Sequence, residues 1–174
     1  ERLWLVSAAV TTVISPKISA AMRESEQEQQ KAIAIGSAQA VGVLSFGFAV
    51  IVALFAEQIL MLLFGNDYLN SALPLQVLAI GAATFAVGRV YASSIAAVGR
   101  PDLTMRVAAG ALTFNVIGNL LLIPKFSADG AAAATAVSYV LAVSLNILIF
   151  NRHFGSTLKD LISSSHLKAA LRTK

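Results

Sequence analysis

The chain has 174 residues, of which 57% are hydrophobic and 13% charged, with a formal net charge of +4 and a mean hydropathy of +0.75. A soluble domain of this length must cover its surface with polar groups, so the composition excludes a soluble protein and predicts apolar surface that faces lipid. The absence of cysteine excludes disulfides, thiolate metal sites and thiol catalysis, and the two histidines lie in a polar tail, which argues against a histidine metal cluster.

Five apolar segments predict membrane-spanning helices, since about 20 mostly apolar residues, rising about 1.5 Å each, cross a hydrocarbon core of about 30 Å. The predicted spans cover residues 3–19, 32–55, 73–98, 103–123 and 131–150. The chain starts at Glu1 without Met or the features of a signal peptide, so we expect a fragment of a longer protein. After the second span, the apolar stretch 59–64 either extends the helix or turns along the membrane interface.

Short connectors rich in Gly, Asn, Asp and Pro separate the later spans. They cover residues 65–67, 98–102 and 124–130. This is the chemistry of helix ends and turns, and links of this length place neighbouring helices antiparallel. The sequence therefore predicts an all-α integral membrane bundle over residues 1–151, followed by a polar tail over 152–174.

Basic residues predict the orientation of the bundle, because Lys and Arg in short loops are retained on the cytoplasmic side. Most of them lie in three segments, 17–31, 99–106 and the tail 152–174, and these fall on one side if the chain crosses five times. We therefore expect a multi-pass protein with a cytoplasmic C-terminus. The tail is expected to be an amphipathic segment on the anionic inner leaflet, or disordered.

Arg89 is the most informative single residue, because it lies several helical turns inside the third predicted span. A guanidinium at depth costs about 2.5–3.5 kcal/mol on insertion scales unless it faces water or an anion. We predict a cavity arginine that attracts an anionic cargo group; the alternatives are a side chain that reaches the interface or one that pairs with another helix. Ser93 follows at i+4 on much the same face, whereas Tyr91 points elsewhere and is a candidate for stacking on a sugar or for interfacial anchoring.

Asn115 and Asn119 are spaced i, i+4 and share one face of the fourth predicted span. Both are candidate cargo-binding residues, but hydrogen bonds between helices explain buried amides equally well, and the same holds for Gln39 and Asn146. Ser138 and Tyr139 in the fifth span are ambiguous in the same way.

Catalytic motifs are not present in the sequence: it contains no nucleophile elbow, P-loop, HExxH or paired carboxylates. We therefore expect no enzyme activity, no cofactor and no metal. Nucleic-acid binding is not expected either, since the positive charge is explained by membrane topology.

Several motifs occur in a particular order along the chain. They are SPKIS at 15–19, LFGNDY at 63–68, AVGRP at 97–101, NVIGNLLLIP at 115–124 followed by Lys125-Phe126, and DGAA at 129–132. In this order the sequence resembles the C-terminal half of the polysaccharide (O-antigen-type) flippase family, within the multidrug/oligosaccharidyl-lipid/polysaccharide exporter superfamily. The resemblance covers nearly the whole chain.

The resemblance implies a twelve-helix transporter of two six-helix halves around a central cavity, with this chain supplying about five helices of one half. It implies translocation of an undecaprenyl-pyrophosphate-linked oligosaccharide, a polysaccharide or O-antigen (lipopolysaccharide) repeat unit, from the inner to the outer leaflet of the bacterial inner membrane by alternating access. Partners would be this cargo, the bilayer, and polysaccharide polymerase and assembly proteins.

Two alternatives remain open at this point. A drug/cation antiporter of the same superfamily would need a carboxylate in the membrane, and none of the predicted spans has an Asp or Glu near its centre. A non-transporting scaffold of polysaccharide assembly would have no polar cavity and would pair Arg89 internally.

Overall fold

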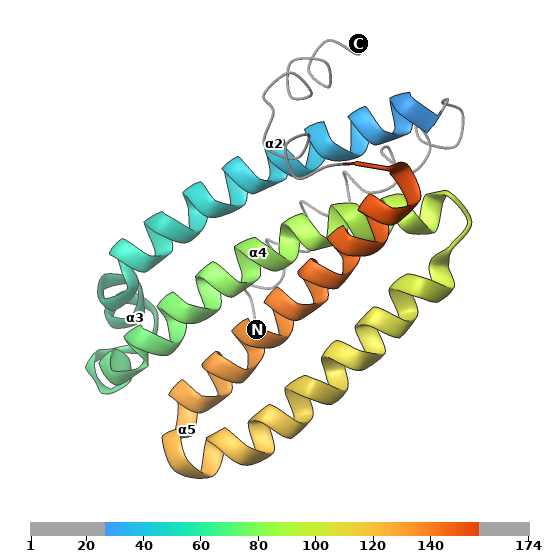
Figure 1. Ribbon diagram of the computed structural model, residues 1–174. Coiled ribbons are helices and arrows are strands. Elements are labelled where there is room, and N and C mark those ends of the chain that lie inside the picture. Colours follow the sequence, from blue (N-terminus) through green and yellow to red (C-terminus); the bar gives the residue numbers. More distant parts are fainter. Residues whose placement is uncertain (1–26, 157–174) are drawn as a thin grey trace.

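The computed structural model describes residues 27–156, and all the regular elements in this range are helices (Figure 1). In chain order they are α2 (Gln27–Leu54), α3 (Ala56–Phe64), the short 3-10 helix η1 (Asn66–Ser71), α4 (Ala72–Ala97) and α5 (Pro101–Phe154). The all-α architecture predicted from the sequence is thus confirmed for these residues. The predicted span 3–19 and tail residues 157–174 lie outside the described residues.

Three stretches of helix are long and apolar enough to cross a membrane: Glu28–Leu54, Asn66–Ala97 and Pro101–Phe154. Helix α4 lies within one residue of the predicted span 73–98 at both ends, and α2 ends within one residue of the predicted span 32–55 but begins five residues earlier, in the polar stretch that precedes the apolar run. The chain is therefore a multi-pass membrane protein.

The two last predicted spans, 103–123 and 131–150, both lie within α5, which doubles back on itself (Figure 1). The reversal centres on Ser127, whose φ of 51° and ψ of −125° are not helical, three residues after Pro124. We call residues 101–126 the first arm and residues 128–154 the second arm. The expected connector 124–130 is therefore a sharp turn between two antiparallel arms.

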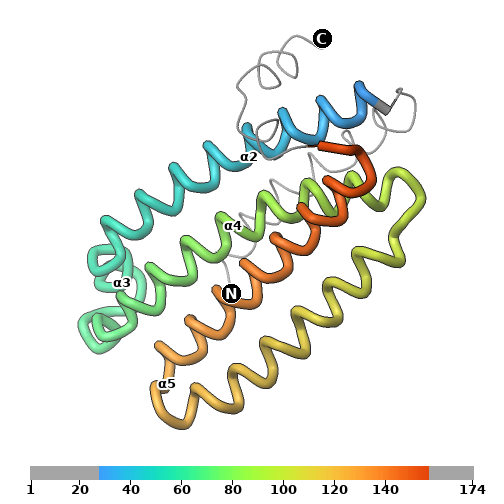
Figure 2. Tube along the Cα trace, viewed as in Figure 1, coloured from blue at the N-terminus to red at the C-terminus, as the bar shows by residue number. Residues whose placement is uncertain are grey.

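The end of α2 resolves an alternative that the sequence left open. The helix stops at Leu54, Phe55 adopts φ −107° and ψ 19°, and α3 starts in a new direction, as the trace in Figure 2 shows. The Nε2 of Gln76 donates a hydrogen bond of 3.0 Å to the carbonyl of Ala53, one of the last carbonyls of α2, which have no partner within their own helix. The apolar stretch 59–64 thus lies entirely within a separate short helix, and its Leu62 is 86% exposed.

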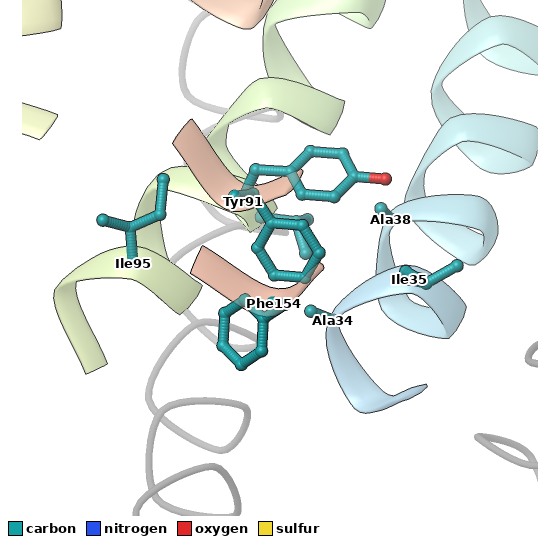
Figure 3. Close-up of a cluster of buried hydrophobic side chains, with 8 residues drawn as sticks. Ala34, Ile35, Ala38, Tyr91, Ile95 and Phe154 are labelled. Atoms are coloured by element: carbon teal, nitrogen blue, oxygen red, sulfur yellow. The ribbon is translucent and has the colours of Figure 1, made fainter. Parts of the chain in front are cut away.

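The buried core lies where α4 packs between α2 and the second arm of α5. Its members are Ala34, Ile35, Ala38, Val90, Tyr91, Ile95, Phe150 and Phe154 (Figure 3). Small residues on α2 let the aromatic rings of the other two helices approach it closely. The Tyr91 and Phe150 rings meet edge to face with their centroids 5.0 Å apart, a favoured geometry for aromatic pairs.

A tight parallel seam joins α4 to the second arm. Gly81 lies against Ala136 and Gly88 against Val143, so the register advances by the same seven residues on both helices. A Cβ on Gly88 would lie 3.2 Å from the Cα of Val143 and closer still to its side chain. Backbones meet this closely in lipid because van der Waals packing, and not a hydrophobic drive, holds the helices together.

Charged residues gather at the two ends of the bundle. The beginning of α2, the end of α4 and both outer ends of α5 lie together at one end (Figure 1). This end carries Lys31, Arg100, Arg106 and Arg152, with Glu28 and Asp102. The opposite end carries Glu57, Asp67 and Asp129, with Lys125. The arrangement agrees with the predicted orientation, and the cytoplasmic location of the basic end stays a prediction.

Candidate cargo-binding cavity

A cavity of about 370 Å³ lies between α4 and the two arms of α5. Its wall on α4 is formed by Phe85, Gly88, Arg89 and Ala92. The first arm contributes Thr104, Val107, Ala108, Ala111, Leu112 and Asn115, and the second arm contributes Thr135, Ser138, Tyr139, Ala142, Val143 and Asn146. The volume is near the lower end of the range of about 300–1,000 Å³ that is usual for ligand pockets.

Arg89 is the charged residue of this cavity. It precedes the last residue of α4, Ala97, by 8 residues, which is about 12 Å along the axis at about 1.5 Å per residue. Its guanidinium makes no hydrogen bond or ion pair to any residue in the range 27–156, and the residues that line the cavity include no Asp or Glu. An unpaired cation at this depth favours a water-filled space or an anion beside it.

The second arm presents a polar stripe to the cavity. Ser138, Tyr139 and Asn146 follow Thr135 by three, four and eleven residues, which places all four on one side of a helix. Ser138 is satisfied locally, since its hydroxyl donates a 2.6 Å hydrogen bond to the carbonyl of Ala134. Tyr139 stacks on Phe85 of α4 with the ring centroids 4.4 Å apart and the planes at 23°. This pair forms an aromatic part of the wall.

A chain of hydrogen bonds links the two arms beside the cavity. The Nδ2 of Asn119 donates to the Oδ1 of Asn115 at 3.0 Å, and the Nδ2 of Asn115 donates to the Oγ1 of Thr135 at 3.2 Å. The predicted sharing of one face by Asn115 and Asn119 is therefore confirmed. Asn115 lines the cavity, whereas Asn119 is not among the lining residues and holds the amide oxygen of Asn115.

The structure brings together only part of the predicted site. Arg89 and Asn115 both line the cavity, but Ser93 does not, and its hydroxyl donates to the carbonyl of Val90 at 2.8 Å. Tyr91 is 4% exposed and belongs to the core cluster against Phe150, on another side of α4. A helix face is narrower than the i, i+4 rule suggests: the cavity side of α4 is centred on Gly88 and Arg89, and Ser93 falls beyond its edge.

Three of the polar and aromatic lining residues were not considered as candidates from the sequence: Phe85, Thr104 and Thr135. For Thr135 a signal existed, because it begins the polar stripe that continues through Ser138 and Tyr139 to Asn146. Phe85 and Thr104 carry no such signal, since a single Phe or Thr in an apolar span is common on any face.

Comparisons with known proteins identify three relatives. An uncharacterized membrane protein of Methanocaldococcus jannaschii is 32% identical over 104 residues, which are 60% of this chain and 20% of the relative. A Haloferax volcanii protein named "Probable low-salt glycan biosynthesis flippase Agl15" is 28% identical over 142 residues, 82% of this chain and 30% of the relative. The capsular polysaccharide biosynthesis protein CapF of Staphylococcus aureus is 30% identical over 115 residues, 66% of this chain and 29% of the relative.

No family model matches the chain, and no solved structure matches it significantly. The chain spans between 20% and 30% of the length of these curated relatives. It is therefore a multi-pass membrane protein that is similar to part of larger proteins, one named as a membrane protein and two named for glycan or capsular polysaccharide biosynthesis.

Proposed function

We propose that this chain is part of a flippase that moves a lipid-linked glycan from the inner to the outer leaflet, and that the Arg89 cavity receives the polar head of this cargo. The observation that carries the proposal is Arg89 itself, a cation without a counter-ion among the described residues, beside a cavity with polar side chains from both arms of α5. The relatives named for a glycan flippase and for capsular polysaccharide biosynthesis support it.

The physical need for such a cavity follows from the cargo. A glycan and its phosphates would lose their water in hydrocarbon, at a cost of several kcal/mol for each unpaired polar group, on the order of 4–8 kcal/mol on alkane scales. A cavity with Arg89, Asn115 and Tyr139 replaces part of that water, while the lipid tail stays in the bilayer. Rocking of two helical bundles then changes the side to which the cavity opens.

The size of the cavity fits one part of the cargo and not the whole. At about 370 Å³ it holds a phosphate and its nearest sugar more readily than a long oligosaccharide. Since the chain is less than a third of each relative, the full protein supplies the remaining walls. We propose a polyprenyl-pyrophosphate carrier of the undecaprenyl type, a bacterial inner membrane location and a cytoplasmic C-terminus.

The alternatives predict different residues in the cavity. A drug/cation antiporter would be supported by a carboxylate facing the cargo, and the lining contributed by residues 27–156 has none while it has one arginine. A non-transporting scaffold would be supported by an Arg89 bound to a carboxylate of a neighbouring helix, and no described residue fills that role. Both observations favour an anionic cargo.

Translocation by the full-length protein in liposomes tests the proposal. The cargo is a polyprenyl-diphosphate-linked oligosaccharide, and its arrival in the outer leaflet is measured with a membrane-impermeant lectin. We expect Arg89→Ala to lower the initial rate about 10- to 100-fold, as for a lost charged hydrogen bond of about 1.5–3 kcal/mol, and Arg89→Lys to retain part of the rate. Arg106→Ala, which removes an exposed arginine outside the cavity lining, is the matched control. Normal rates for both Arg89 variants at normal protein levels would refute the proposal.

A further inference from the structure

The side chain of Asn146 is buried in the cavity wall without a partner. It is 7% exposed, its Oδ1 is enclosed, and its amide makes no hydrogen bond with any residue in the range 27–156. Asn115 differs from it in this respect, since its amide is held by Thr135 and Asn119. Asn146 is thus an amide of the cavity whose hydrogen-bonding capacity is left unused by the described part of the chain.

An unpartnered amide in this position destabilises the protein when no cargo is bound. An acceptor that is buried without a donor loses its hydrogen bonds to water, and this costs free energy because no new hydrogen bond replaces them. Within a membrane span there is no bulk water that could supply the missing donor. The neighbours Ile147 and Leu148 show that the segment is otherwise apolar. The Nδ2 of the same amide is not enclosed, so a bound group that accepts a hydrogen bond from Nδ2 would satisfy part of this amide.

Arg89 and Asn146 lie at nearly the same height in the cavity. Gly88 packs against Val143 in the parallel seam, Arg89 follows Gly88 by one residue, and Asn146 follows Val143 by three. The Cα atoms of the two residues therefore differ by about 3 Å along the helix axes, at about 1.5 Å per residue. Since both residues line the same cavity, adjacent groups of one bound molecule can contact both side chains.

The two side chains require different chemistry. The guanidinium of Arg89 only donates and attracts an anion, whereas an amide both accepts and donates without charge. Sugar hydroxyl and acetamido groups offer the matching donors and acceptors. The stacked rings of Phe85 and Tyr139 add an aromatic part to the same cavity wall, against which a sugar ring packs well.

We propose that Asn146 forms a subsite for a hydroxyl or acetamido group of the sugar next to the phosphate that Arg89 attracts, and that it selects the glycosylated carrier over the bare one. This inference rests on the proposed function, because it names which part of the lipid-linked glycan each residue binds. Asn146 contributes to specificity, while Arg89 attracts both forms of the carrier.

Binding to the purified full-length protein in lipid nanodiscs tests the inference with two probes, a polyprenyl diphosphate and the same lipid carrying a single N-acetylated sugar. We expect Asn146→Leu to weaken binding of the glycosylated probe roughly 3- to 10-fold, as for the loss of one neutral hydrogen bond, and to leave binding of the bare diphosphate within about twofold, too small to represent a hydrogen bond. Arg89→Gln should weaken binding of both probes. Asn151→Leu, which changes an amide of the same arm outside the cavity, is the control and should leave both affinities unchanged.

Thermal unfolding without cargo separates a binding role from a structural one. If the amide of Asn146 has no partner, Asn146→Leu raises the midpoint temperature of unfolding of the cargo-free protein. If the amide instead has a structural role, the same substitution lowers that midpoint. Asn146→Ala, judged by the same two probes, replaces Asn146→Leu if the larger side chain prevents folding.

Each outcome of the binding experiment bears on one of the two proposals. Equal effects of the Asn146 variants on both probes, or no effect on either, would overturn the sugar subsite while leaving the Arg89 cavity intact. Failure of the unmodified protein to bind either probe would instead overturn the proposed function, and the subsite with it.

Discussion

Gly88 of α4 lies directly against Val143 of the second arm of α5, with no space between the two helices for a side chain. The contact belongs to the wall of the Arg89 cavity, since both residues line it. The distance between α4 and the second arm, and hence the position of Arg89 relative to Asn146, therefore depends on this glycine.

Gly88→Ala is expected to destabilise the protein, because its methyl group would overlap Val143 and force the helices apart. Overpacking of this kind costs about 1–3 kcal/mol. Gly110→Ala is the matched control: a Cβ there meets nothing within 4 Å, and alanine is favoured over glycine in a helix by about 1 kcal/mol. Thermal unfolding of the full-length protein in detergent should give a lower midpoint for Gly88→Ala and an equal or higher one for Gly110→Ala. The reverse order would contradict the close seam.

The hydrogen bond between Asn115 and Thr135 is expected to couple the two arms of α5. In a double-mutant cycle of Asn115→Leu and Thr135→Val, the coupling energy should be about 0.6–1.7 kcal/mol, the usual range for hydrogen bonds between membrane helices. Unfolding free energies of the four proteins provide the measurement. If the effects of the two substitutions on the unfolding free energy were strictly additive, the 3.2 Å hydrogen bond would contribute nothing to the pairing of the two arms.

The turn at Ser127 should become more stable with glycine. Ser127 has a φ of 51° and a ψ of −125°, a conformation that costs a residue with a Cβ on the order of 1–3 kcal/mol and is open to glycine. Ser127→Gly should therefore raise the unfolding midpoint, and Ser127→Val should lower it. A lower midpoint for the glycine variant would show that another conformation joins the arms.

The sequence predictions agree with the structure where a feature is determined by residues close together in the sequence. The end of α2 and both ends of α4 follow from long apolar runs with turn residues at their ends, which act within a few residues, whereas α2 begins at Gln27, five residues before the predicted span. The shared face of Asn115 and Asn119 follows from helix periodicity in the same way. These features were predicted correctly.

The features that were missed depend on contacts between helices. The cavity requires the first arm to lie away from α4 while the second arm touches it at Gly88, and no pattern within either segment encodes that difference. Tyr91 was a candidate for sugar stacking, yet its side of α4 meets the small residues of α2 and the ring of Phe150. What a side chain contacts depends on which helix lies beside it, and the residue spacing within its own helix does not reveal that neighbour.

The basic end of the bundle is expected to face the cytoplasm. Two matched aspartates mark the ends: Asp67 lies in η1 at the acidic end, and Asp102 lies in the first turn of α5 at the basic end. In intact cells, a membrane-impermeant maleimide should label the Asp67→Cys variant. It should label the Asp102→Cys variant only after the membrane has been permeabilised. The opposite labelling pattern would reverse the orientation, and with it the direction of transport proposed here.

Protection of a cavity residue by the cargo tests the central claim most directly. The chain has no cysteine of its own, so Ala111→Cys in the cavity lining and Ala109→Cys, two residues earlier and outside it, provide a matched pair in a full-length protein freed of any other reactive thiol. We predict that a lipid-linked oligosaccharide slows the reaction of a small thiol reagent with Ala111→Cys and leaves the reaction with Ala109→Cys unchanged. Equal reaction rates with and without cargo at Ala111→Cys, in a protein that still transports, would contradict binding of the cargo in this cavity.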